Sequence, residues 1–577
     1  MPNLQIQWTR GSRSQAADRP IIILAYALAR CDVFDACIDS NHRGKSCQTE
    51  TGDAGAAANE SSSAAYQSNY TNRLPTMGNI SFQLRQRDRV PDELVERAYM
   101  ADLEGIPVGA RVAWEGDRLV FTRPSLESGH FHIPWRSESN GELLLTTGTL
   151  IQRESPYLLA VELARGTLNR LINQLHDWEI RGLETTEAVQ QDLRETLQLL
   201  AKSATLRGVD SAEAESLACQ VLDRCSGLTS SLIWNYTNQA FAVRRAAQPN
   251  RLVVLGSALG NDGLSPKQSE WLCRTFNTAA VPLSWHDAEE VGGEFIWSQH
   301  DRHIQWAQDS GISICGGPLL SFDAFCFPDW LYLWEDDPGT VHSYIQRYVE
   351  AAVRRYHREV DLWHGVARIN IKDALPLDED ARLNIAVSAV KTLRQVDAET
   401  PLMISFDQPW GEYLNANPND PPPISYADAM LRMDLNVSLL GIELNLGFWP
   451  HGTGRRDVIQ IGKTLDQWSV MGLPIIVFLR VPSGVVPADG KTSNMALPTG
   501  YGVDAPTPTS QTQLVADLVP HLLAKPYIQG VIWNQWSDSD RSRFPNAGLL
   551  DEQGKAKSSL QKLFEIRKQF VNIPAAD

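Results

Sequence analysis

PLMISFD at residues 401–407, LLGIELNL at 439–446 and PIIVFLRV at 474–481 are short apolar segments separated by stretches with helical patterning. Apolar strands that alternate with helices in this way predict parallel βα units. The same pattern extends outward in RLVVLGSAL (251–259), AAVPLSW (279–285), ISICGG (312–317), VDLWHGVARIN (360–370) and GVIWNQW (530–536). Eight such units that close on themselves form a (β/α)8 TIM barrel, an α/β fold whose functional site lies at the carboxyl ends of the strands.

Motifs at the ends of these segments follow one another in a defined order. LSWHDAEEVGGEFIW at 283–297 holds Trp285, Glu289, Gly293, Phe295 and Trp297 at the offsets of the motif Met-Lys-Trp-Asp-x-x-Glu-Pro-x-x-Gly-x-Phe-x-Phe. Further matches are GSA (256–258), Pro328-x-Trp330, VDLWHGVAR, GIELNLG, GLPIIVFLRV, Trp533 and GLLDEQGKAK. On these residues, the stretch from about 251 to 570 resembles glycoside hydrolase family 10, which implies an endo-1,4-β-xylanase type of barrel that takes a β-linked polysaccharide.

The resemblance also identifies the positions where the family holds its two catalytic glutamates. The family is a retaining glycosidase, in which one glutamate is acid and base and the other is the nucleophile. In this chain the acid/base position holds Arg368, and the nucleophile position holds Leu479, or Arg480 if the alignment shifts by one residue. Arginine releases no proton at a useful pH, and neither leucine nor arginine forms a glycosyl ester. The positions of the family's supporting polar residues are changed as well, to Val281, Ser284, Pro318, Asn445 and Gly447.

Three other carboxylates near strand ends are candidates for a relocated catalytic group: Glu443, Asp407 and Asp538. Glu443 lies two residues before Asn445, so both side chains are expected on the same side of their strand. A carboxylate inside a barrel needs a cationic partner, and Arg368 is the expected partner of Glu443. Asp407 ends its segment, where it either serves catalysis or caps the following turn. Asp538 lies in a loop, where solvation also explains it.

Tryptophans are better retained than acids at the predicted barrel mouth. Trp285, Trp410, Trp449 and Trp533 lie at or just past strand ends, and sugar rings pack on flat indole faces. We expect these residues, together with Asn445, to bind substrate, with Trp533 as the central platform. The alternative interpretation is that about half of the tryptophans are buried beneath the loops.

Composition and spacing restrict the partners. The net charge of −17, from 69 acidic and 52 basic residues in 577, argues against nucleic acid or an anionic membrane surface. No apolar run is long enough for a transmembrane helix. The eight cysteines form no CxxC pair and no HExxH motif occurs, so we predict no metal site and no cofactor. The histidines at 130, 132, 300 and 303 are interpreted as surface or packing residues, and no pattern indicates an oligomeric state.

Four parts are expected along the chain. Residues 1–76 form a flexible leader rich in Ser, Ala and Asn, 77–153 a small β domain, 154–248 a helical segment, and 249–572 the barrel. PIIILAYALA at 20–29 would suit the apolar part of an export signal, whereas a translation start at Met77 would leave the protein in the cytoplasm.

Three functions fit these patterns. The leading hypothesis is a family 10-like barrel that binds a β-linked polysaccharide or oligosaccharide in an open cleft without retaining hydrolysis. The first alternative is an active glycosidase with relocated carboxylates, where an inverting pair would lie about 6.5–9.5 Å apart. The second is a non-catalytic scaffold that holds partners through the helical segment and the β domain.

Overall fold

The computed structural model of the protein describes residues 78–85, 87–137, 141–247, 253–260, 262–323, 326–486, 495–500 and 505–571. The expectations for the leader, for the apolar run at 20–29 and for a start at Met77 lie outside these residues. Within the described ranges, no helix is long and apolar enough to cross a membrane.

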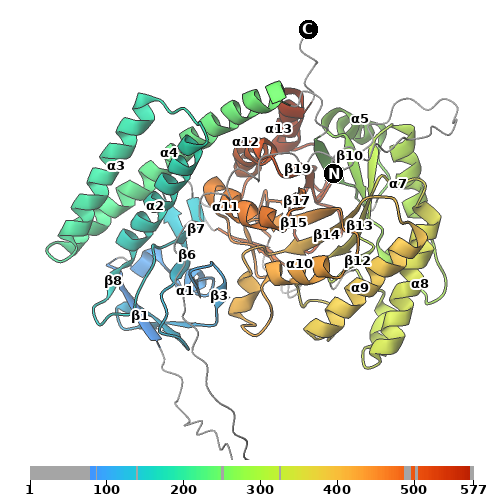
Figure 1. Ribbon diagram of the computed structural model, residues 1–577, viewed down its shortest axis with the longest axis horizontal. Helices are drawn as coiled ribbons and strands as arrows, with labels where there is room; N and C mark the ends of the chain where they lie inside the picture. The colour runs from blue at the N-terminus through green and yellow to red at the C-terminus, as the bar shows by residue number, and fades with distance from the viewer. Residues whose placement is uncertain are drawn as a thin grey trace, which may run out of the picture.

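Two small sheets precede the helices and the barrel, and their strands pair antiparallel except for the parallel pair β1–β8 (Figure 1). The first has the strand order β4-β5-β1-β8 and the second β3-β2-β6-β7. Phe82 of the first sheet stacks on Phe131 of the second with ring centroids 4.8 Å apart, so the sheets share an aromatic core. The elements are β1 (Gly78–Gln83), α1 (Asp92–Val95), β2 (Tyr99–Ala101), β3 (Pro107–Val108), β4 (Arg111–Glu115), β5 (Arg118–Arg123), β6 (His130–Ser137), β7 (Gly141–Thr146) and β8 (Tyr157–Leu158).

One strand of this region is shorter than the sequence pattern suggests. The apolar, β-rich sequence LLLTTGTLI at 143–151 predicts a single strand, but β7 ends at Thr146. The chain bends after β7 and pairs again only at an isolated bridge between Gly129 and Leu150. Alternating apolar residues therefore overestimate the strand where a turn interrupts the pairing.

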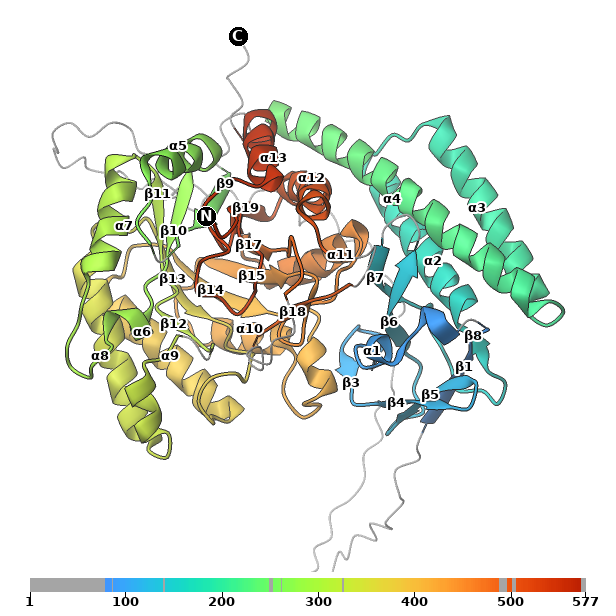
Figure 2. The same ribbon diagram turned by 180° about the vertical axis from the view of Figure 1, so that it is seen from behind.

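Three long helices follow: α2 (Leu159–Ile180), α3 (Glu187–Leu206) and α4 (Ser211–Ala247). The side chain of Thr186 caps α3, and Asp210 accepts hydrogen bonds from the backbone N–H groups of residues 212 and 213 at the start of α4. Their apolar stripes pack the helices against one another and against the barrel helix α12 (Pro508–Ala524; Figure 2). Trp178 of α2 stacks on Tyr236 of α4 with centroids 4.1 Å apart, which fixes α2 and α4 together.

A closed barrel of parallel strands forms the rest of the chain, and it confirms the predicted (β/α)8 fold (Figures 1 and 2). The strand order is β11-β10-β9-β19-β17-β15-β14-β13-β12, and pairing of β11 with β13 closes the ring, so that β11 and β12 share the third position. The strands are β9 (Val254–Ala258), β10 (Thr278–Val281), β11 (Ser313–Gly316), β12 (Leu320–Ser321), β13 (Leu362–Ala367), β14 (Leu402–Asp407), β15 (Leu439–Asn445), β17 (Ile475–Arg480) and β19 (Ile528–Trp533).

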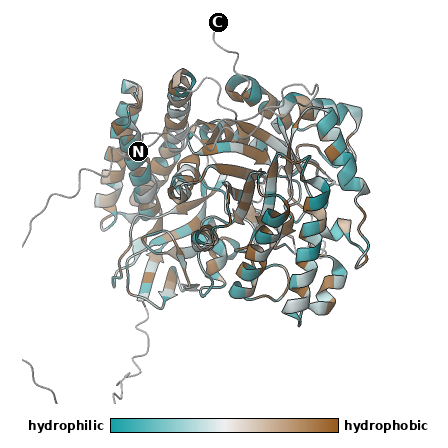
Figure 3. Ribbon diagram, turned by 45° about the vertical axis from the view of Figure 1, so that its right-hand side comes forward, coloured by the Kyte–Doolittle hydropathy of each residue, from teal (hydrophilic) through white to brown (hydrophobic). Residues whose placement is uncertain are grey.

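Amphipathic helices surround these strands, and Figure 3 shows hydrophobic residues concentrated on the barrel strands. Several helices start at clear capping residues; Ser265, for example, forms a reciprocal capping box with Gln268. The helices are α5 (Pro266–Thr275), α6 (Trp285–Ala288), α7 (Ser298–Asp309), α8 (Pro338–Tyr356), α9 (Glu379–Val396), α10 (Pro423–Arg432), α11 (Val458–Trp468), α12 (Pro508–Ala524) and α13 (Ser558–Ile566). The short pair β16 (Phe448–Trp449) and β18 (Leu497–Pro498) lies among the mouth loops.

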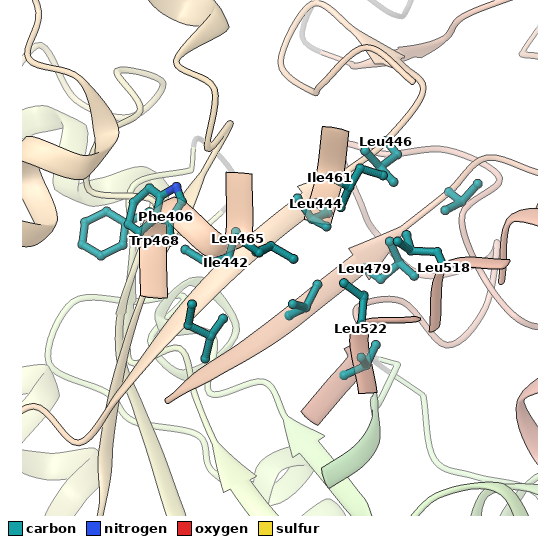
Figure 4. Close-up of a cluster of buried hydrophobic side chains, with 14 of the residues drawn as sticks. Phe406, Ile442, Leu444, Leu446, Ile461, Leu465, Trp468, Leu479, Leu518 and Leu522 are labelled. Atoms are coloured by element: carbon teal, nitrogen blue, oxygen red, sulfur yellow. The ribbon is translucent and has the colours of Figure 1, made fainter. Parts of the chain in front are cut away.

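Successive side chains of each barrel strand point alternately inward and outward. The inward set forms a compact inner core: Val254, Ala258, Ala280, Cys315, Leu362, Met403, Leu439, Ile476, Phe478 and Ile532. The outward set packs on the helices, as Figure 4 shows for Leu444 and Leu479 against α11 and α12. This alternation decides which side chains at the strand ends reach the barrel mouth.

The small sheets are joined to the barrel through a buried polar contact. Arg456, just before α11, donates to the hydroxyl of Tyr99 on β2 and to Glu412 in the loop after β14, with both distances at 2.7 Å. The backbone N–H of Leu144 also donates to the carbonyl of Arg455 at 2.7 Å. The loop that follows Asp407 is therefore tied to the β sheets.

Candidate functional site

A cavity of about 200 Å³ lies at the carboxyl ends of the barrel strands. Its polar lining is dominated by charged and amide side chains: Asp287, Asp323, Arg368, Glu443, Arg480, Asn534, Gln535, Asp540, Arg541 and Arg543. Its apolar lining includes Leu283, Trp285, Phe478 and Phe544. The cavity is where a TIM barrel places its functional residues.

Strand β17 delivers Arg480, not Leu479, to this cavity. Ile476 and Phe478 belong to the inner core, so the next inward position is Arg480. Leu479 points the other way, where Figure 4 shows it beside Leu518 and Leu522 of α12. Of the two alternatives for the family's nucleophile position, the arginine is the one that reaches the mouth.

Arg368 follows β13 and is the centre of a buried ion-pair network. Its guanidinium forms an ion pair with Asp323 and lies 3.0 Å from a carboxylate oxygen of Asp407 and 3.7 Å from one of Asp373. The residue has a left-handed φ of 60°, a conformation that costs on the order of 1–3 kcal/mol and persists where the surroundings impose it. Arg543 completes the network, paired with Asp373 and 3.8 Å from Asp323.

This network shifts the pKa values of its members. Burial alone would lower the pKa of Arg368, but Asp323 and Asp407 outweigh it and raise that pKa. Burial raises the pKa of Asp407 to about 7 against the opposing attraction of Arg368, and nearby Glu443 adds to the rise. Because Arg368 is shared among several carboxylates, it does not fully compensate Asp407. For Asp373, burial is outweighed by His451, Arg368 and Arg543, which hold its pKa at about 2.

Glu443 is held by a hydrogen-bonded chain that runs across three strands. The hydroxyl of Ser405 donates to Glu443 at 2.9 Å and lies 2.9 Å from Nε2 of His364. A hydroxyl has one proton, so the ring nitrogen must donate to it. Burial lowers the pKa of His364 to about 3, which keeps the ring neutral. The cationic neighbour of Glu443 is Arg480, at 3.7 Å.

The expected direct pair between Glu443 and Arg368 does not form. Arg368 is drawn instead toward Asp323 and Asp407, whose carboxylates are nearer. Glu443 and Asn445 do lie on one side of β15, and Asn445 donates to Asp407 at 2.9 Å and accepts from Arg480 at 3.1 Å. Asn445 thus connects the two arginine sites.

The three candidate carboxylates are not brought together in one place. Asp407 and Glu443 are register partners on β14 and β15, but only Glu443 lines the cavity, and Asp407 is fully buried. Asp538 lies away from the cavity lining, paired with Lys557 at 2.6 Å and accepting from the N–H of Gly548. Its contacts are those of a loop anchor.

The predicted tryptophan platform is not exposed at the mouth. Trp533 is 1% exposed and donates from its indole to the carbonyl of Ala547. Because Ile532 belongs to the inner core, Trp533 points outward into the helix layer. Trp285 does line the cavity, but it is buried: its ring stacks on Tyr348, and its indole N–H donates a hydrogen bond to the carboxylate of Glu289.

The other two tryptophans lie toward the β sheets. Trp410 is half-buried, and the guanidinium of Arg456 covers its ring at 4.0 Å. Trp449 is half-buried on β16, beside a small separate cavity that Tyr99 also lines. A tryptophan at a strand end therefore does not by itself indicate an exposed ring face: two of these four residues are buried and two are half-buried.

Several residues of the site were not predicted from the sequence, among them Asp323, Arg543 and Phe544. Asp323 follows the short strand β12, and Arg543 and Phe544 come from the loop after β19. The guanidinium groups of Arg480 and Arg368 lie 5.0 and 5.7 Å from the Phe544 ring centroid. No periodicity marks these positions, since they meet only through the closure of the barrel. Among the residues that the structure describes, no cluster of His, Cys, Asp or Glu could hold a metal ion.

Comparison with known proteins shows that part of the chain matches a protein family. Residues 235–375 match the model of the family described as Glycosyl hydrolase family 10. This barrel resembles glycosyl hydrolase family 10. The matched residues run from the C-terminal part of α4 to the loop after β13 and include Arg368.

Relatives with similar sequence or fold are family 10 proteins and xylanases. Endo-1,4-beta-xylanase C of Paenibacillus barcinonensis is 29% identical over 126 residues, which is 20% of this chain and 11% of that protein, so the chain spans about a tenth of the length of this curated relative. Xylanase B of Clostridium stercorarium F9 is 15% identical over 57% of this chain and 98% of its own, with a TM-score of 0.42. Xylanase 10B of Thermotoga maritima is 14% identical over 55% of this chain and 96% of its own, also at 0.42.

Proposed function

We propose that the cavity at the barrel mouth binds a β-linked oligosaccharide of the xylan class and does not hydrolyse it by double displacement. The observation that carries this proposal is that Arg368 after β13 and Arg480 on β17 both line the cavity. The motif resemblance implies a glutamate at the position of Arg368, and one at Leu479 or, with a shift of one residue, at Arg480.

The two arginines oppose retaining hydrolysis in charge as well as in chemistry. The transition state of glycoside cleavage resembles an oxocarbenium ion, and the family's glutamates supply a negative charge and a proton donor beside it. A guanidinium supplies neither, and its positive charge repels the developing cation. The nearby carboxylates of Asp323, Asp373 and Asp407 are already engaged with the arginines.

The lining of the cavity suits a polyol. Sugar hydroxyls both donate and accept hydrogen bonds, and the cavity offers both kinds of partner in Asp287, Asn534, Gln535 and Arg541. Flat apolar contact is limited to buried rings such as Trp285 and Phe544. We therefore expect a weak site, with a Kd in the range of about 10 μM to 10 mM.

The test has a binding arm and a chemical arm. Calorimetry of the full chain with xylotetraose should give saturable binding that Asp287→Ala weakens, whereas Asp309→Ala, an exposed aspartate at the end of α7, should leave it unchanged. Incubation with a fluoro-sugar inactivator of retaining glycosidases should leave the intact mass unchanged. Absence of binding, or a covalent adduct on any carboxylate of the barrel, would refute the proposal.

A second candidate is an active glycosidase that uses Glu443 and Asp407. In its favour, the two residues are register partners on adjacent strands, and Glu443 lies close enough to Asp407 to contribute to its raised pKa. Against it, Asp407 is fully buried and Arg368 lies beside it at 3.0 Å. Release of reducing sugar that is abolished by Glu443→Gln would favour this candidate.

A further inference from the structure

Of the four arginines that line the cavity, Arg368, Arg480 and Arg543 differ in how they are paired. Arg368 and Arg543 each contact carboxylates directly, through Asp323, Asp373 and Asp407. Arg480 is held mainly by amides. It donates from Nη1 to Asn445 at 3.1 Å, and the amide oxygen of Asn534, in the orientation that satisfies its hydrogen bonds, accepts from Nη1 at 2.9 Å and from Nη2 at 3.2 Å.

The carboxylate nearest to Arg480, that of Glu443, already accepts a hydrogen bond from Ser405. Glu443 lies 3.7 Å from the guanidinium, beyond hydrogen-bond distance, and accepts a hydrogen bond from Ser405 on its other oxygen. Burial lowers the pKa of Arg480, with the charge of Arg368 acting in the same direction and Glu443 opposing it. The positive charge of Arg480 is therefore less compensated than that of Arg368, whose pKa is raised by its carboxylates.

The guanidinium of Arg480 is also pre-organised and accessible. Its plane lies over the Phe544 ring at 5.0 Å from the centroid, while the two asparagines hold its edge. The side chain lines the cavity and keeps 17% of its surface exposed, against 4% for Arg368 and 3% for Arg543. Asn445 and Asn534 accept from Nη1 twice and from Nη2 once, which leaves one N–H of Nη2 for a ligand carboxylate. Little conformational entropy is lost when such a ligand binds a guanidinium that is already held in place.

We propose that the oligosaccharide taken by this cavity carries a uronic acid and that Arg480 binds the carboxylate of that sugar. This inference rests on the proposed function and adds the chemical class of the ligand. The carboxylates of Asp287, Asp323 and Asp540 also line the cavity, so they disfavour a ligand carboxylate away from the arginines Arg480 and Arg541, and the variants below distinguish these two. The acidic wall thereby orients the sugar as well as limiting which sugar binds.

The experiment compares two ligands of equal length on the full chain by calorimetry: xylotetraose, and xylotetraose with one glucuronic acid branch. The measured quantity is the ratio of their dissociation constants. We expect the acidic ligand to bind at least about tenfold more tightly, as an added charged hydrogen bond implies, and the ratio to fall as salt is raised. Acetate alone should not bind detectably, because it lacks the sugar contacts.

Two variants assign the effect to one residue. Arg480→Gln should bring the ratio close to one, and Arg480→Lys, which keeps the charge without the planar guanidinium, should give an intermediate ratio. Arg354→Gln, an exposed arginine on α8, is the matched control and should keep the wild-type ratio. Circular dichroism is used to check that each variant is folded. The ratio of dissociation constants on the wild-type protein, and its dependence on salt, test the proposal even if a variant fails to fold.

The outcomes separate this inference from the function on which it rests. If neither ligand binds, the proposed function fails. If xylotetraose binds and the ratio is one, or if Arg541→Gln removes the preference while Arg480→Gln keeps it, the inference about Arg480 is overturned and the proposed function stands. If acetate binds as tightly as the acidic oligosaccharide, the site serves free small acids and the sugar assignment is wrong.

Discussion

Replacement of Arg368 by leucine tests whether the ion-pair network supports the barrel. The guanidinium is buried and faces Asp323, Asp407 and, at 3.7 Å, Asp373. Its removal leaves buried carboxylates without their cation, a change that costs about 3–5 kcal/mol. Two features favour the lower end of that range. Asp323 and Asp373 still have Arg543 nearby, and Asp407 has a pKa of about 7 and can take up a proton. We expect Arg368→Leu to lower the free energy of unfolding by about 3 kcal/mol at neutral pH.

The assay is urea unfolding of the full chain followed by tryptophan fluorescence. The loss should be smaller at pH 5 than at pH 8, because protonation of Asp407 removes the uncompensated charge. The control is Arg354→Leu, whose exposed pair with Glu350 on α8 should contribute less than about 1 kcal/mol. A loss below 1 kcal/mol for Arg368→Leu, or one that is equal at both pH values, would refute the reasoning about buried charge.

Three further predictions follow from burial and pairing. Asp407 has a folded pKa of about 7, above its ordinary value of about 3.9, so its contribution to stability is present at low pH and is lost as the pH rises through 7. The melting temperature of Asp407→Asn, relative to that of the wild type, should therefore increase between about pH 5 and pH 8. A difference in melting temperature that is the same at both pH values would contradict this. Trp533→Ala should cost about 3–5 kcal/mol of stability in urea unfolding because the ring is buried, and a loss under 1 kcal/mol would show that the ring is exposed after all. Arg456→Met leaves Glu412 unpaired at the contact with the β sheets and should lower stability by about 3–5 kcal/mol, whereas an unchanged melting curve would mean that this contact is not needed.

The fold could be predicted from the sequence because barrel strands are continuous apolar runs at regular intervals. The sequence alone did not predict which side chain at the end of a strand points into the barrel. A shift of one residue exchanges the two faces of a strand, and the register of β17 against β19 shifts between Ile475 and Ile476. Leu479 and Trp533, which are register partners, consequently both face the helices, while Arg480 and Asn534 meet in the cavity.

The remaining residues of the site have no local signal at all. Asp323 and Arg543 are separated by more than two hundred residues in the sequence and share a network only because the barrel closes. The same is true of the chain from His364 through Ser405 to Glu443, which spans three strands. Only the alternation within β15, which placed Glu443 and Asn445 on one side, was local enough to be derived in advance.

One measurement tests the central claim most directly: calorimetric titration of the full chain with xylohexaose, followed by chromatography of the same sample after a day at the assay temperature. The account predicts saturable heat of binding, with a Kd in the range of about 10 μM to 10 mM, and recovery of the ligand as intact hexasaccharide. Shorter xylo-oligosaccharides in the recovered sample would show that the arginines at the mouth have not removed hydrolysis. The absence of any binding heat at millimolar ligand would show that the cavity is not a sugar site.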